Sequence, residues 1–118
     1  MKNDIKGMKE ICSKNKAEFV FVNMPTNIFT GHRVIRTSAD ILDSFFYHNN
    51  NIDSIYHSIA SSYNIPYIEC TNRFKNLQPK TGYFYLYDGH PTIQGYEEIA
   101  LHIGEQLLAL NLLRAKRN

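Results

Sequence analysis

Two short apolar runs stand out in the pattern of hydrophobic and polar residues along the chain. Residues 18–24 form the first run, which closes at Pro25, and residues 65–70 form the second, with Pro66 near its start. Both runs are rich in aromatic and β-branched residues, as is typical of strands covered on both faces in a parallel sheet. Pro66 suits the first residues of a strand, where no ladder N–H is needed.

Elsewhere apolar residues recur at helical spacing. This spacing predicts helices at residues 4–15, 38–46, 52–63 and 93–113. Ser38 and Thr92 are expected N-caps, and Asn64, a residue type that tolerates the left-handed conformation, is expected to end the third helix. Residues 25–37 and 71–87 show no clear period and are predicted to be irregular.

The predicted order is helix, strand, helix, strand, loop, helix. Such alternation favours a three-layer α/β domain with a short parallel sheet flanked by helices. The length of 118 residues supports one domain at most. Two strands alone would leave two free edges, so we expect the chain to be part of a larger unit or to pair with a partner.

Charge and hydropathy narrow the range of partners. The net charge of +2 does not favour nucleic acid, and the one basic cluster, residues 114–117, follows a helix whose dipole favours cations at its end. No apolar run approaches the roughly 18 residues of a membrane span. The first residues lack the apolar core of a signal peptide, so the compartment is left open.

Cys12 and Cys70 are too few for a disulfide framework, and no cysteine or histidine pair has zinc-finger spacing. We predict two small, buried thiols, with Cys70 as a nucleophile kept as the alternative. No metal or cofactor is predicted.

The sharpest chemical signal is the segment from Asp88 to Thr92, directly before the last helix. A histidine acting as general base needs a carboxylate to orient its ring. Gly89 lets the backbone turn so that Asp88 and His90 can face one site. The same residues also fit a structural turn capped by Thr92, or half of a metal site with a distant histidine.

Asp-Gly-His-Pro-Thr-x-x-Gly-Tyr at residues 88–96, followed by Glu-x-Ile-Ala, resembles the last conserved block of the SGNH (GDSL-like) serine ester hydrolases. Residues 22–25 resemble the family's strand before its substrate loop, and residues 65–71 resemble its Gly-Ile-x-x-Ile-Asp-Leu strand. These pieces are collinear along almost the whole chain. The resemblance implies a flavodoxin-like three-layer fold, of which residues 1–118 would be the C-terminal portion.

The resemblance implies that His90 is the general base of a Ser-His-Asp triad and that Asp88 orients it, while Gly95 and Tyr96 are structural. Two features depart from the family. Most members place the acidic residue three positions before the histidine, where this chain has Tyr87. The Gly-Asp-Ser block with the nucleophile and the Gly-x-Asn-Asp block of the oxyanion hole are absent.

Other residues carry weaker signals. His32 and Arg33, in the loop after the first strand, are predicted substrate contacts by the same resemblance. The remaining histidines and the serines of the helix at 52–63 are expected at the surface. The aromatic run 83–87 is expected to pack in the core, with a pocket wall for an apolar or sugar substrate as the alternative.

A stand-alone metal-dependent enzyme that uses Asp88, His90 and a distant histidine is one hypothesis, and two further functions are open at this point. The first is the C-terminal part of a hydrolase for carboxylic esters of carbohydrates or lipids, of the deacylase or acetylesterase class, inactive without a serine-bearing segment. The second is a truncated, non-catalytic module that self-associates or binds a partner through the exposed sheet surface. Under either, we expect pairing with an N-terminal segment or with a second copy of the chain.

Overall fold

The two apolar runs form two parallel strands in the computed structural model, which describes residues 1–30, 51–79, 81–85 and 89–113. Strand β1 (Phe21–Asn23) lies beside β2 (Tyr67–Glu69), with Val22 opposite Ile68. The predicted parallel pairing is therefore confirmed, although each strand is shorter than its apolar run. Among the described residues, β1 and β2 pair only with each other.

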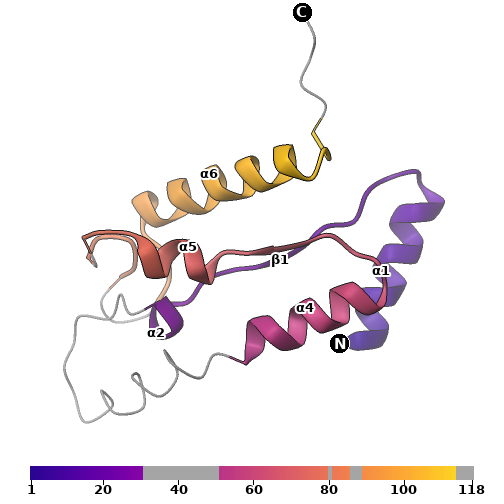
Figure 1. Cartoon of the computed structure of the whole chain (residues 1–118), viewed down its shortest axis with the longest axis horizontal. Coiled ribbons are helices and arrows are strands. Elements are labelled where there is room, and N and C mark those ends of the chain that lie inside the picture. The colour runs from indigo at the N-terminus through magenta and orange to yellow at the C-terminus, as the bar shows by residue number, and fades with distance from the viewer. Residues whose placement is uncertain (31–50, 80, 86–88, 114–118) are drawn as a thin grey trace, which may run out of the picture.

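Helices flank this small sheet. The described helices are α1 (Lys2–Lys14), α2 (Asn27–Thr30), α4 (Ile52–Ser62), α5 (Thr71–Asn76) and α6 (Ile93–Ala109). In Figure 1 the strands run between α6 on one side and α4 on the other, while α1 lies at their amino-terminal ends and α2 and α5 lie beyond their carboxyl ends. The architecture is thus a mixed α/β arrangement with a short parallel sheet between helices.

The core has two clusters of buried residues. One joins Ile5 of α1, Ala60 of α4 and Ile65, with Phe21 and Tyr67 of the strands packed against it. The other joins α5, α6 and the segment around residue 84 through Phe74, Tyr83, Phe84 and Ile99. Through Phe21 and Tyr67, which are both half-buried, the strands pack against the cluster on the side of α1 and α4.

The sequence prediction was wrong in two short segments. Residues 71–76 form α5, and residues 27–30 form the single turn of α2, where irregular structure was expected. Both helices are too short for an apolar period to appear in the sequence. The helix predicted at 38–46 lies outside the described residues.

Helix α6 ends earlier than predicted. The leucines after residue 109 continue the apolar pattern, but Asn111 has a φ of 56°, in the left-handed region that ends helices. The amide of Leu112 then donates to the carbonyl of Leu107 at 2.9 Å, which closes the helix end. Asn64 ends α4 in the same conformation, with a φ of 51°, as predicted.

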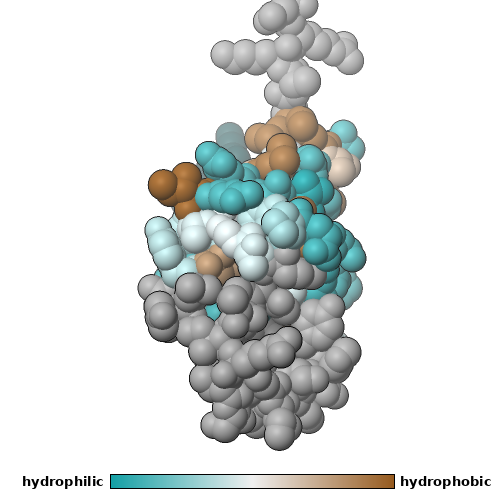
Figure 2. Space-filling view, turned by 90° about the vertical axis from the view of Figure 1, so that its left-hand side faces the viewer, coloured by the Kyte–Doolittle hydropathy of each residue, from teal (hydrophilic) through white to brown (hydrophobic). Residues whose placement is uncertain are grey.

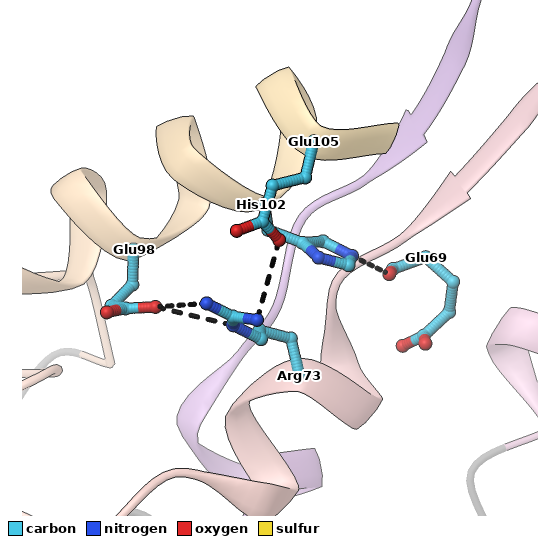
Figure 3. A network of polar contacts seen from close by, with 5 residues as sticks. All are labelled: Glu69, Arg73, Glu98, His102 and Glu105. Atoms are coloured by element: carbon cyan, nitrogen blue, oxygen red, sulfur yellow. Dashed lines mark hydrogen bonds and ion pairs between the residues drawn. The ribbon is translucent and has the colours of Figure 1, made fainter. Parts of the chain in front are cut away.

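A polar network fixes α6 on the elements below it (Figure 3). Arg73 of α5 donates through Nη2 to Glu98 at 3.4 Å, and its Nη1 lies 3.5 Å from Glu105. His102 of α6 contacts the carbonyl oxygen of Glu69 at the end of β2, at 2.8 Å. Residues 98, 102 and 105 share one helix face, so the network sets the rotation of α6.

None of the helices in the described part of the chain is long and apolar enough to cross a bilayer.

Candidate functional site

The segment before α6 is held in place by main-chain hydrogen bonds to residues 83–85. The amide of Tyr85 donates to the carbonyl of His90, and the amide of Thr92 donates to the carbonyl of Tyr83, both at 2.9 Å. An antiparallel bridge joins Phe84 to Pro91. His90 therefore sits on a backbone that is anchored to the buried aromatic cluster.

Thr92 is the N-cap of α6, as predicted. Its hydroxyl accepts a hydrogen bond from the amide of Gly95 at 3.2 Å and donates to the carbonyl of Gly82. The first satisfies one of the amides that a helix start leaves unpaired. The cap thus determines where α6 begins relative to His90.

His90 is exposed on the wall of an open pocket of about 460 Å³. The opposite wall comes from the segment that follows β1, including Met24, Asn27 and Phe29. The pocket thus lies at the carboxyl end of β1, where open α/β sheets usually carry their ligand sites. Candidate catalytic groups on a loop beside such a crevice are well placed to meet a substrate.

Gly89 brings α2 close to the His90 loop. Its φ of +73° lies in the region that favours glycine, and a Cβ built at this position would lie 2.9 Å from Oδ1 of Asn27. Both the conformation and the close contact require a residue without a side chain. The predicted role of Gly89 in turning the loop is consistent with this geometry.

The remaining predicted site residues lie outside the described residues. They are Asp88, His32 and Arg33. The pairing of Asp88 with His90 and the contact of His32 and Arg33 with substrate therefore stay predictions.

No serine of the described part of the chain lines the His90 pocket. Ser58, Ser61 and Ser62 are exposed on α4, as expected. Within the described ranges, no group of three or more acidic, cysteine or histidine residues converges to hold a metal ion.

A second pocket, of about 470 Å³, was not predicted from the sequence. Its lining includes Asp53, His57, Tyr67, Glu69 and His102. Asp53 accepts hydrogen bonds from the side-chain amide of Asn23 and, at 2.9 Å, from the hydroxyl of Tyr67. Burial, and then this bond to the Asp53 carboxylate, raise the pKa of Tyr67 above its usual value. Only the fold brings residues 53, 67 and 102 together, so no local sequence pattern predicts this pocket.

The structure corrects one minor expectation about histidines. His57 is exposed on α4 as predicted, but His102 is half-buried and bonded to the main chain of Glu69. The contact gives His102 a structural role in holding α6 on β2.

The aromatic run divides between core and surface. Tyr83 and Phe84 are buried against Phe74, with ring centroids 5.8 and 5.3 Å away, whereas Tyr85 is exposed. None of these three lines the His90 pocket. Of the described part of the run, Tyr83 and Phe84 therefore pack in the core, as expected, and Tyr85 does not.

Cys70 is fully buried at the end of β2. Burial, followed by the nearby carboxylates of Glu69 and Asp53, raises the pKa of the Cys70 thiol to about 11. A nucleophilic cysteine requires the opposite shift. The structure thus favours the prediction of a buried thiol over the alternative of a nucleophile.

We therefore expect iodoacetamide at pH 8 to modify Cys12 at least about tenfold faster than Cys70, because Cys12 is half-buried and Cys70 is inaccessible and protonated. Intact-mass spectrometry with peptide mapping measures both rates. In urea the two rates should become similar. Preferential modification of Cys70 in the folded protein would restore the nucleophile alternative.

Comparisons with known proteins were made against family models, curated proteins and solved structures. No match to this chain was found in any of the three.

Proposed function

We propose that this chain is the C-terminal part of an SGNH-type hydrolase domain that acts on carboxylic esters. His90 is the general base, and Asp88 orients its ring. The observation that carries the proposal is the position of His90, exposed beside an open pocket at the carboxyl end of β1 on a loop anchored to α6. The motif at residues 88–96 and the parallel strand pair support the same family and its flavodoxin-like fold.

The chemistry assigned to His90 is proton transfer. A serine hydroxyl loses its proton to a ring nitrogen of His90 while its oxygen attacks the ester carbonyl. The imidazolium then gives that proton to the departing alcohol, which leaves an acyl-serine. In the second half His90 takes a proton from water, the resulting hydroxide attacks the acyl group, and the serine oxygen recovers the proton.

The serine comes from a segment that these 118 residues do not contain, because no serine here has the Gly-Asp-Ser context. We expect a fluorophosphonate probe to leave the folded chain unlabelled. Intact-mass spectrometry after incubation measures this, with a complete serine hydrolase in the same reaction as the positive control. Stoichiometric labelling of one serine, lost in His90→Ala, would show that a complete active site exists within the chain.

A second candidate function rests on the outward face of α6. Ile93 is 77% exposed, and Leu101 and Leu108 lie more than half exposed on the same face. Figure 2, which views the carboxyl ends of the strands, shows hydrophobic residues in its upper part, where α6 lies. Exposed apolar patches of this kind often bind another protein surface, so a non-catalytic partner-binding module is the alternative. It predicts that His90 has no influence on ester hydrolysis in any assembly of the chain.

A further inference from the structure

The pocket beside His90 differs in chemistry from the second pocket, and this difference bears on the substrate. We infer that the His90 pocket receives an uncharged, apolar acyl group larger than acetyl. The inference rests on the proposed function in naming the bound group as the acyl part of an ester. Binding of such a group is nevertheless a property of the pocket that exists without catalysis.

The walls of the His90 pocket are mainly apolar. Met24, Phe29, Pro91 and Tyr96 supply side chains from three separate segments of the chain. No carboxylate, lysine or arginine is present among the described lining residues. The second pocket, in contrast, holds the carboxylates of Asp53 and Glu69. Apolar walls with few polar groups are typical of sites that bury an apolar ligand part and use the polar groups for orientation.

The polar side chains among the described lining residues are those of Thr26, Asn27, His90 and Tyr96. Asn27 lies against Gly89, the residue before His90, so an amide group and an imidazole come from adjoining segments. An acyl chain on the apolar walls would place its carbonyl toward these groups, because burying a polar carbonyl without a hydrogen bond is unfavourable. A sugar would instead place hydroxyls against the side chains of Met24 and Phe29, which are poor hydrogen-bond partners.

The size of the pocket argues against acetyl as the bound group. A space of about 460 Å³ lies within the range of roughly 300–1,000 Å³ found for sites of small organic ligands. An acetyl group would fill only a small part of it and would leave most of the apolar wall in contact with water. A chain of several methylenes, or an aromatic acyl group, covers that wall and gains binding with each buried carbon.

The test uses the 118-residue chain and three amides that it cannot hydrolyse. Hexanamide carries the apolar chain, gluconamide has the same carbon count with hydroxyls, and acetamide has the same head without the chain. Titrations followed by two-dimensional NMR measure each Kd and map the shifts. We expect hexanamide to bind at least about tenfold tighter than either control, with the largest shifts at Thr26, Asn27 and Gly89.

Two tyrosines offer a matched pair of variants. Tyr96 lines the pocket and is 52% exposed, whereas Tyr85 is 53% exposed and does not line it. Tyr96→Ala is expected to weaken hexanamide binding at least about fivefold, and Tyr85→Ala to leave it within twofold. Both substitutions remove an exposed ring, so we expect both variants to fold. A difference in affinity between them then reports on the pocket.

The inference is overturned if gluconamide or acetamide binds as well as hexanamide, or if the shifts map elsewhere than on the pocket. It is also overturned if the two tyrosine variants bind hexanamide equally. Because no nucleophile and no proton transfer are involved, these results are independent of the role of His90. A catalytic failure of His90 with intact hexanamide binding would reject the proposed function and keep the apolar pocket.

Discussion

Replacing His90 with alanine is expected to lower ester hydrolysis at least about a thousandfold in a polypeptide that joins this chain to a serine-bearing segment completing the domain. Loss of the base leaves the serine protonated and the leaving alcohol without a proton donor. In serine hydrolases removal of one triad member costs roughly 10⁴ to 10⁶ in kcat. The measurement is kcat/KM for a hexanoyl ester, with folding checked by circular dichroism.

A matched control is His57→Ala, since His57 is also an exposed histidine but lies on α4 at the second pocket. We expect its kcat/KM to stay within about twofold of the unchanged protein. In the 118-residue chain alone, neither substitution should alter the slow background rate. A completed, folded domain that keeps its activity after His90→Ala would reject His90 as the general base and favour the partner-binding alternative.

The elements that the sequence predicted well are those with a long or uniform apolar pattern. The strand runs at 18–24 and 65–70 enclose the observed β1 and β2, and the period at 52–63 matches α4 to within one residue. The predictions that Thr92 caps α6 and that Asn64 ends α4 are also confirmed, because capping depends on local backbone chemistry that the residue type indicates. These features are decided within a few neighbouring residues.

Features that depend on distant contacts were not predictable in the same way. Helix α5 is stabilised by burial of Phe74 against Tyr83, Phe84 and Ile99. Residues 71–76 are too few to show a helical apolar period in the sequence. The second pocket likewise depends on three elements meeting at the end of β2. His102 looked like a surface histidine because its partner, the main chain of Glu69, is 33 residues away.

The candidate site also combines a feature that the local sequence predicts with one that depends on distant contacts. The place of His90 before α6 follows from its local motif, but the wall facing it comes from Met24 to Phe29, more than sixty residues earlier. The aromatic run 83–87 was expected in the core, with a pocket wall as the alternative, and of its described residues Tyr83 and Phe84 are buried whereas Tyr85 is exposed. Which residues form the pocket was therefore decided by the packing of β1 and α2 and not by proximity along the chain.

The position of the His90 loop depends on the close approach of α6 to Tyr83 and Pro91, which Gly95 permits. Gly95 is buried, and a Cβ at this position would lie 2.1 Å from the carbonyl oxygen of Tyr83 and 3.0 Å from Cβ of Pro91. The same carbonyl accepts the amide of Thr92, so it cannot move away without breaking the bond that anchors the His90 loop. A main-chain carbonyl cannot avoid the added Cβ by changing rotamer, as a side chain could.

Gly95→Ala is therefore expected to lower the free energy of unfolding by about 3 kcal/mol, at the upper end of the cost of overpacking. Gly104→Ala is the matched control, because Gly104 lies in the same helix with nothing within 4 Å of an added Cβ. There the better helix propensity of alanine should raise stability by about 0.5–1 kcal/mol. Urea unfolding measures both variants, and equal effects of the two would contradict the close approach.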